Sequence, residues 1–290
     1  MRDEKKCYLC GCAEHKKRSG SVRDRSELEI LECTSCGLVF LSSFAHICEK
    51  FYENSNMHGS EVLDIHAWLD EAVWDDERRF QYLKQILPNR KLLDFGCGAG
   101  GFLLKTQSIT SLSHGLEPEQ RLCDHFHANG LKVFSNLKET CGAISEKYDV
   151  ITIFHVLEHI PDPKGVLNEL GKLLADGGQI IMEVPNADDA LLTLYHNEPF
   201  SNFTYWSCHL YLYNMETLQM LFDLTNLKVN YIEQIQRYPL SNHLYWLSKG
   251  KPGGHQKWHF LDSPELNALY ERHLASINKC DTIIASVSNY

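Results

Sequence analysis

Residues 91–100 (KLLDFGCGAG) combine a short apolar strand with a loop in which every second residue is glycine. Glycine lacks a Cβ, so Gly96, Gly98 and Gly100 allow positive φ and a close approach of the backbone to a ligand. A helix expected to start near Gly101 would point its free N–H groups and the positive end of its dipole at the same turn. The segment therefore predicts a loop that binds a nucleotide-like cofactor. Its G-x-G-x-G spacing departs from the G-x-G-x-x-G dinucleotide fingerprint.

Two later segments follow in the order expected of a parallel sheet. Residues 113–116 predict a second strand that ends at Glu117, about 20 residues after the glycine loop. A carboxylate in this place can accept both ribose hydroxyls of a nucleoside, whereas an isolated Glu at a strand end would simply be solvated. Residues 148–154 form a nearly continuous apolar run, which is typical of a strand buried on both faces. The stretch His155–Pro163 comes directly after that strand.

In this order, the segments resemble the motifs of class I S-adenosylmethionine (SAM)-dependent methyltransferases, and residues 94–100 are similar to their D-x-G-x-G-x-G motif. The resemblance implies an α/β fold with a Rossmann-like methyltransferase sheet and helices on both faces. It also implies that the stretch after residue 154 forms the floor of the SAM site and faces the acceptor, and that Asn136 and Leu137 lie near the adenine. The cofactor-binding residues implied are Asp94, Gly96, Cys97, Gly98, Gly100, Glu117, Asn136, Leu137, Phe154, His155 and Leu157.

Two C-x-x-C pairs near the N-terminus predict a metal site. Cys7 and Cys10 form one pair, Cys33 and Cys36 the other, and 22 residues separate them. Two thiolates on each of two tight turns can share one tetrahedral Zn²⁺. A redox-active pair or unbound thiols are the alternatives, and Cys12 competes with Cys10 as a ligand. A module this small needs the metal for its folding energy.

The pattern of helices and strands divides the chain into three parts. Residues 1–44 predict a zinc ribbon, and residues 45–88 predict a helical linker or lid that packs over the SAM site. Residues 89–290 predict the methyltransferase domain, in which strands and helices alternate. Two insertions are expected in it, at about 186–214 and 239–280.

Composition excludes some classes of function. The 290 residues carry a net charge of −10, which makes a nucleic-acid substrate unlikely, because such binding depends on Lys and Arg neutralising phosphates. No apolar run is long enough to cross a membrane, and the charged N-terminus lacks the apolar core of a secretory signal. A cytoplasmic protein is therefore expected. The oligomeric state stays open.

The paired cysteines ahead of the SAM motifs, with the His209–Tyr211 stretch leading into a helix at 215–222, resemble bacterial sugar and polysaccharide methyltransferases that carry an N-terminal zinc-binding segment. This resemblance implies a small hydroxylated acceptor such as a sugar, either nucleotide-linked or carrier-linked. Zinc-bearing sugar C-methyltransferases have a Tyr, His and Glu set that does not map onto this chain, so O-methylation is favoured over C-methylation. A catalytically inactive scaffold protein and a nucleic-acid methyltransferase are the alternatives.

Histidines are the candidate bases, because a hydroxyl acceptor is a poor nucleophile until its proton is removed. His159 lies just after the apolar strand at 148–154, beside Glu158, which could orient its ring, and His209 lies in the first insertion. His155 is the third candidate, although its backbone could instead hold the methionine amino group of SAM. Each of these histidines could equally be a hydrogen-bonded wall residue. Aromatic residues of the first insertion could stack on a sugar or form core: Phe200, Phe203, Tyr205, Trp206, Tyr211 and Tyr213.

Overall fold

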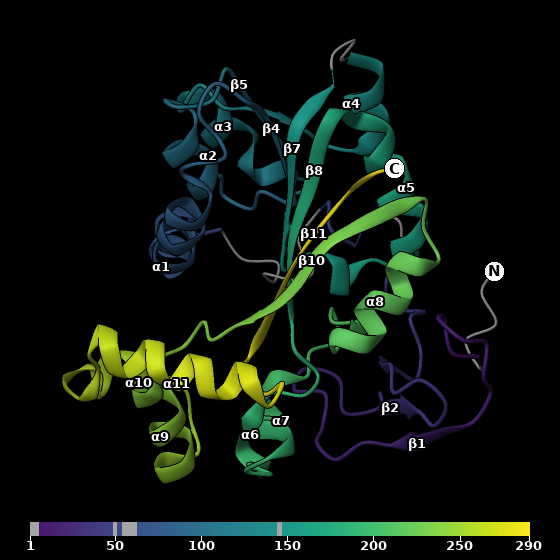
Figure 1. Ribbon diagram of the computed structural model, residues 1–290, viewed down its shortest axis with the longest axis vertical. Helices are drawn as coiled ribbons and strands as arrows, with labels where there is room; N and C mark the ends of the chain where they lie inside the picture. The colour runs from purple at the N-terminus through teal and green to yellow at the C-terminus, as the bar shows by residue number, and fades with distance from the viewer. Residues whose placement is uncertain (1–5, 49–50, 54–62, 144–146) are drawn as a thin grey trace.

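The computed structural model describes residues 6–48, 51–53, 63–143 and 147–290, without the side chains of 141–143. A seven-stranded sheet forms its centre, in the order β10-β11-β8-β7-β4-β5-β6 (Figure 1). The strands of this sheet are β4 (Lys91–Phe95), β5 (Leu112–Leu116), β6 (Lys132–Phe134), β7 (Tyr148–Phe154), β8 (Leu174–Pro185), β10 (Leu227–Ile235) and β11 (Thr282–Asn289).

Strands β6, β5, β4, β7 and β8 pair in parallel, as the alternation of strands and helices predicted. Strand β11 is antiparallel to both of its neighbours, β8 and β10. It lies between two strands that come earlier in the chain and starts at the edge of the sheet where both of them end, since Thr282 pairs with Ile235 and with Pro185. The carboxyl ends of β4, β5 and β7 therefore lie at one edge, which is where open α/β sheets bind ligands.

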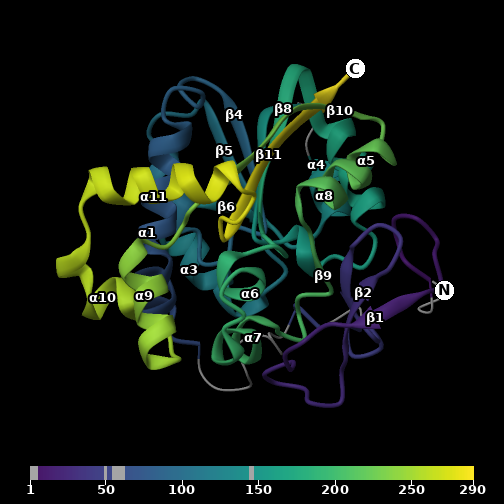
Figure 2. The ribbon, with the colours of Figure 1, turned by 60° about the horizontal axis from the view of Figure 1, so that its bottom comes forward.

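Helices cover both faces of the sheet (Figures 1 and 2), with α1 to α3 on one side and α4, α5 and α8 on the other. The α-helices are α1 (Ile65–Leu83), α2 (Gly101–Thr106), α3 (Cys123–Ala128), α4 (Leu137–Ala143), α5 (Pro163–Leu173), α6 (Ala190–Thr193), α7 (Glu198–Thr204), α8 (Met215–Asp223), α9 (Leu240–Lys249), α10 (Gly254–Lys257) and α11 (Pro264–Ser276). Short 3₁₀ helices are η1 (Gln120–Leu122), η2 (Leu157–His159) and η3 (His259–Leu261). No helix in the described residues is long and apolar enough to cross a membrane.

Adjacent residues of a strand belong to two separate apolar clusters, one on each face of the sheet. Leu93 and Ile180 pack with side chains of α5 and α8, whereas Leu92 and Ile181 pack with side chains of α2 and α3 on the other face. Burial of each such side chain stabilises the fold by about 1.5–3 kcal/mol. Because both faces are covered, the strand residues are apolar without alternation, and this explains the continuous apolar run that predicted β7.

Helix α1 lies against the glycine loop on the face of the sheet that α2 and α3 cover, in the segment for which the sequence predicted a lid. The expected apolar positions Leu83 and Leu87 are fully buried. The helix begins at Ile65, where Asp64 caps it by accepting a hydrogen bond from the backbone of Ala67. The sequence predicted a helical linker over residues 45–88, of which residues 49–50 and 54–62 lie outside the described part of the chain.

The N-terminal residues form a second sheet, in the order β1-β2-β3-β9. Strands β1 (His15–Lys17), β2 (Ile30–Cys33) and β3 (Val39–Leu41) come from the predicted ribbon, whereas β9 (Tyr211–Leu212) comes from the first insertion. The buried side chains of the ribbon belong to the same apolar cluster as one face of the large sheet. The ribbon and the main domain therefore share one core.

Candidate active site

The glycine loop has the backbone conformation that its sequence predicted. Gly96, Gly98 and Gly100 have φ of 79°, 52° and 81°, in the left-handed region that favours glycine. A Cβ on Gly96 would lie 2.3 Å from a methyl carbon of Val156, which follows β7. The loop between β4 and α2 is therefore packed directly against the loop that follows β7.

Glu117 connects the ends of β4 and β5. Its carboxylate accepts hydrogen bonds from the backbone N–H of Gly98 and of Glu119, each at 3.0 Å. Burial raises the pKa of this carboxyl to about 7. A carboxylate with two N–H donors still has free acceptor positions, so Glu117 can bind a hydroxyl beside the glycine loop.

The other predicted cofactor residues surround this loop or lie at its edge. Asp94 is buried and accepts a hydrogen bond from the Thr152 hydroxyl at 2.7 Å, and burial raises its pKa to about 7. The ring of Phe154 packs edge-on against Phe102, and Arg79 lies over it at 4.6 Å. Cys97 and Leu157 are buried. These contacts fix the floor under the loop from both β4 and β7.

Asn136 and Leu137 lie at the start of α4, beyond the end of β6, which is two strands away from β4. The Asn136 side chain accepts a hydrogen bond from the backbone of Glu139 at 3.0 Å and so acts as a helix cap. Their predicted place beside the adenine stays a prediction.

A glutamate and three histidines meet at this edge of the sheet: Glu158, His155 and His159 follow β7, and His209 comes from the first insertion. His155 has a φ of 55°, which is uncommon for a residue with a side chain, and its N–H donates to the Glu183 carbonyl. Its Nδ1 lies 3.4 Å from a carboxylate oxygen of Glu158. Glu158 is fully buried, and neither of its carboxylate oxygens has a hydrogen-bond partner among the described residues. Burial raises the pKa of this carboxyl to about 8.

His209 reaches this group from the first insertion. Its ring centroid lies 5.0 Å from that of His159, with the rings nearly perpendicular. The backbone N–H of Leu210 donates to the Glu158 carbonyl at 2.8 Å, which holds the insertion against η2. One polar atom from each of Glu158, His159 and His209 lies within 4.8 Å of the others, a spacing that would also suit a shared cation. The structure thus unites the two leading candidate bases.

Desolvation keeps these histidines neutral. It lowers the pKa of His209 to about 4 and lowers the pKa values of His155 and His159 well below their usual range. A neutral imidazole has one nitrogen that can accept a proton or a hydrogen bond. Nδ1 of His209 has no hydrogen-bond partner in the described part of the chain. These imidazoles are therefore uncharged at neutral pH, and Nδ1 of His209 is available for a hydrogen bond with a bound acceptor.

An ion-pair network that the sequence did not predict fixes α1 at this edge of the sheet. Glu183 on β8 accepts hydrogen bonds from Arg78 at 2.7 and 2.9 Å and from Arg79 at 2.9 Å. Arg237, just after β10, donates two hydrogen bonds of 2.8 Å to Asp75. The only sequence signal was a glutamate inside the apolar run IIMEV of β8. Charged groups from two distant segments, β8 and the residues after β10, thereby hold α1 in place.

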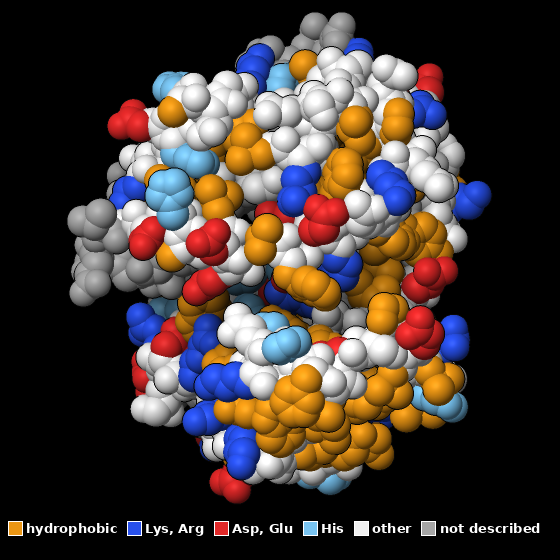
Figure 3. Space-filling model, turned by 90° about the vertical axis from the view of Figure 1, so that its left-hand side faces the viewer, with side chains coloured by type: hydrophobic (Ala, Val, Ile, Leu, Met, Phe, Trp, Pro, Cys, Tyr) orange, Lys and Arg blue, Asp and Glu red, His pale blue; other side chains and the backbone are white. Residues whose placement is uncertain are grey.

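The aromatic residues of the first insertion divide into two kinds. Tyr205, Tyr211 and Tyr213 are almost fully buried and belong to the core. Trp206 is half-buried, and its ring lies 5.9 Å from that of His209. The molecular surface is hollowed across the middle of the face in Figure 3, and hydrophobic side chains gather below that hollow. Trp206 therefore lies beside the histidine group, whereas Phe200 and Phe203 pack against Trp246.

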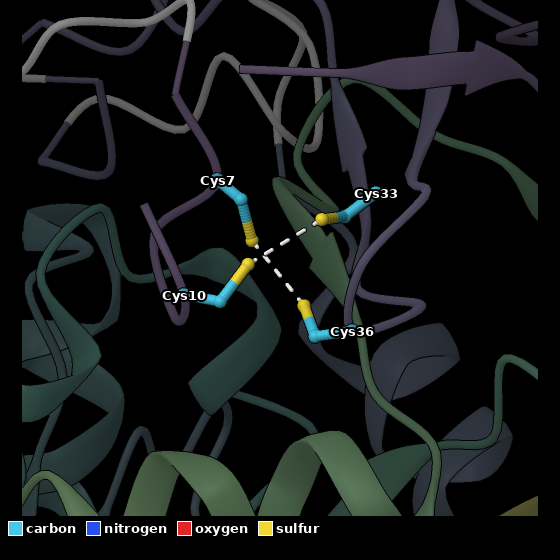
Figure 4. A group of neighbouring side chains, drawn as sticks. All are labelled: Cys7, Cys10, Cys33 and Cys36. Atoms are coloured by element: carbon cyan, nitrogen blue, oxygen red, sulfur yellow. Dashed lines mark hydrogen bonds between the residues drawn. The ribbon is translucent and has the colours of Figure 1, made fainter. Parts of the chain in front are cut away.

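The four predicted cysteines converge on one point (Figure 4). Sγ of Cys7 lies 3.4 Å from Sγ of Cys36, and Sγ of Cys10 lies 3.5 Å from Sγ of Cys33. All four sulfurs lie within 4.8 Å of one another. Tetrahedral zinc with Zn–S bonds of about 2.3 Å needs sulfurs about 3.8 Å apart, so the arrangement fits the ion. Cys12 is not part of this group.

The backbone of the two cysteine turns explains their shared Cys-x-x-Cys-Gly pattern. Gly11 and Gly37 have φ of 72° and 80°. Each donates its N–H to the carbonyl of the first cysteine of its own turn, at 3.0 Å. Each turn is therefore closed by a glycine whose backbone is in the left-handed region, and each turn places its two sulfurs on the same side.

A parallel sheet with this glycine loop and a carboxylate at the end of the next strand defines a Rossmann-like methyltransferase. The chain matches the family described as Methyltransferase domain over residues 67–232, which is more than half of its length, and it belongs to that family. The family and fold predicted from the sequence are thereby confirmed.

Curated relatives include the ubiquinone biosynthesis O-methyltransferases of Salmonella arizonae and Escherichia coli, which are 30% and 31% identical to this chain over 160 residues. The matches cover 48% of this chain and 65% and 66% of the relatives, so the chain spans just under two thirds of their length. A possible histamine N-methyltransferase from Thermotoga maritima is similar at a TM-score of 0.49 and 15% identity, covering 78% of this chain and 94% of that chain. An N-methyltransferase of Bradyrhizobium japonicum is similar at 0.46 and 16%, covering 79% and 93%.

Proposed function

We propose that this chain transfers the methyl group of SAM to a hydroxyl of a small acceptor. The observation that carries the proposal is the meeting of two groups at neighbouring strand ends. The glycine loop with Glu117 follows β4 and β5, and the histidine group follows β7, which pairs with β4. The loop suits a nucleoside, and the neutral imidazoles suit an acceptor that must lose a proton. The names of the curated relatives support oxygen as the acceptor atom.

When bound, SAM supplies a methyl group already activated by its sulfonium. Glu117 and the backbone around Gly98 would hold its nucleoside, above a floor that includes Phe154. The main task of the protein is then to hold the acceptor in line with the methyl group, and such orientation can provide much of the rate acceleration. His159 or His209 would accept the hydroxyl proton as the methyl group is transferred.

A sugar, nucleotide-linked or carrier-linked, is the acceptor we propose. The likeness of the cysteine pairs and the His209 stretch to bacterial sugar methyltransferases supports this choice. Trp206 beside His209 supports it physically, because an aromatic face stacks well on the apolar face of a sugar ring. The net charge of −10 agrees with a small acceptor better than with a nucleic acid.

We also propose that Cys7, Cys10, Cys33 and Cys36 bind one structural Zn²⁺. The four converging sulfurs and the paired left-handed glycines support this assignment. Metal analysis of the purified chain should give about one zinc per chain. Cys10→Ser should lower the zinc content and the unfolding temperature, whereas Cys12→Ser should change neither. An equal loss in both variants would refute the ligand set.

Calorimetric titration with SAM tests the methyl-transfer proposal at its first step. Zinc-loaded protein should bind SAM and its demethylated product, and a panel of nucleotide-linked sugars should then be screened for transfer of radiolabelled methyl. An inactive scaffold protein would show no SAM binding. We favour the enzyme, because a degenerate site has no physical need for this glycine loop. Absence of SAM binding by folded, zinc-loaded protein would refute the proposed function.

A further inference from the structure

We infer that the N-terminal module (described residues 6–48) is a positioning device for the segment that carries His209. This inference rests on the proposed function, because it gives the module a role in orienting a base of that reaction. The His209 segment comprises residues 205–212, between α7 and the end of β9. The module contacts it along most of its length.

The first contact point is Arg23. Its backbone N–H donates to the Tyr205 carbonyl at 3.0 Å. Its guanidinium lies 4.5 Å above the ring centroid of Trp206 and 5.2 Å from that of Phe203. The Trp206 ring in turn lies edge-on to the ring of His209. Arg23 therefore orders the aromatic neighbour of the candidate base.

Ser207 is held through all of its polar groups. Its N–H and its hydroxyl donate to the two carboxylate oxygens of Asp24, at 2.9 and 2.6 Å. Its carbonyl oxygen lies 2.8 Å from Nε2 of His46, which donates to it. Ser207 is only 2% exposed. Hydrogen bonds to a charged group are stronger than neutral ones, so Asp24 is the main anchor of the segment.

The residues after His209 are held by strand pairing. The N–H of Leu41 donates to the Leu210 carbonyl at 3.1 Å, and β3 then pairs with β9 in the register Phe40 with Tyr211. His209 itself lies between the Ser207 anchor and this pairing. The backbone on both sides of His209 is thus held by residues of the N-terminal module.

The cysteine group lies at the other end of the same hairpin. Cys33 ends β2, and its N–H donates to the Leu38 carbonyl at 2.9 Å, next to the start of β3. The Cys33–Cys36 turn therefore connects β2, which carries Cys33, to β3, which pairs with β9. Loss of the metal should loosen β3 and, through it, the His209 segment, without a direct effect on the glycine loop.

Hydrogen exchange measured by mass spectrometry on the full, zinc-loaded chain tests the inference. Asp24→Ala and Arg23→Ala should speed amide exchange of peptides covering 205–212 about tenfold or more. Arg25→Ala is the matched control, because the Arg25 side chain forms an exposed ion pair with Glu27, at 3.4 Å, rather than a contact with Ser207 or Trp206. Asp24→Asn should rescue the slow exchange, since its amide can still bond the Ser207 backbone and hydroxyl.

Two further readouts separate positioning from general stability. The NMR resonances of the His209 ring should move in Asp24→Ala, whereas those of His114, which bonds Tyr148 inside the main sheet, should not. The dissociation constant for SAM should change less than about twofold, because Asp24 bonds Ser207, whereas Glu117 bonds the glycine loop in a separate part of the site. Chelation of the zinc should speed exchange in β3 and in 205–212 before it does so in residues 91–118.

The outcomes are distinct. Unchanged exchange in 205–212 for both Arg23→Ala and Asp24→Ala would overturn the inference, as would equal loosening of residues 91–118. If Asp24→Ala does not fold, Arg23→Ala and Asp24→Asn decide the question. If the wild-type chain does not bind SAM, the proposed function fails, while the exchange data still show whether the module orders the segment.

Discussion

The affinity for SAM should depend on pH through Glu117. Burial raises the pKa of this carboxyl to about 7 in the free protein. The nucleoside hydroxyls would donate to its ionised form, so binding favours the carboxylate. The affinity for SAM should therefore be highest well above pH 7 and should fall as the pH drops below 7.

The size of the effect comes from the fraction of ionised carboxyl. With a pKa of about 7, the dissociation constant scales as one plus the ratio of protonated to ionised Glu117. It should therefore be about tenfold higher at pH 6 than at pH 8, which corresponds to about 1.4 kcal/mol. Below pH 6, each further unit should weaken binding about another tenfold.

Isothermal titration calorimetry of SAM across this range is the assay, with Glu117→Gln as the key comparison. The amide cannot titrate, so this variant should bind weakly and lose the Glu117 part of the pH dependence. The α-amino group of SAM titrates near pH 8, and its contribution is common to both proteins. Asp94→Asn is a second control, because burial also raises the pKa of Asp94 to about 7. The reasoning is refuted if Glu117→Gln shows the same slope as the wild type.

Three other perturbations have defined outcomes. Gly96→Ala and Gly130→Ala both place a side chain at positive φ, which should cost each variant about 1–2 kcal/mol of unfolding free energy. Only at Gly96 does the new Cβ clash with a neighbour, so thermal unfolding should show the larger loss of stability for Gly96→Ala. Arg237→Met leaves the buried Asp75 carboxylate of α1 without its main partner. Urea unfolding should show a loss of about 3 kcal/mol in unfolding free energy, and a loss under about 1 kcal/mol would contradict the role of this ion pair. His159→Ala and His209→Ala should lose methyl transfer while keeping SAM binding; full activity in both would remove histidine from the mechanism.

Local patterns predicted the parts of the site that lie on one short segment each. The glycine loop, Glu117 and strand β7 are specified by residue types at fixed spacing, because each role depends on the conformation of a few consecutive residues. Helix α8 was expected at 215–222 and is observed at Met215–Asp223, where Asn214 and Thr217 form a capping box. Such end signals act within one turn of helix and are legible in the sequence.

Features that join distant segments were not predicted. The pairing of β3 with β9 depends on a two-residue strand, which has no periodicity to recognise. The Arg78–Glu183 pair depends on the packing of α1 over the end of β8, and polar residues on a surface helix usually indicate only solvent exposure. The antiparallel direction of β11 was not predicted for a similar reason, since the residues of an apolar strand do not indicate whether it runs parallel or antiparallel to its neighbours.

The register that places Phe40 beside Tyr211 also has a bearing on synthesis by the ribosome. At about 5–20 residues per second, the growing chain needs roughly 10–35 s between making β3 and making β9. During that interval β3 has an open edge, and such edges promote wrong pairing between chains. All four cysteines are already made by then, so early capture of a metal ion would keep the nascent hairpin folded until its last strand emerges.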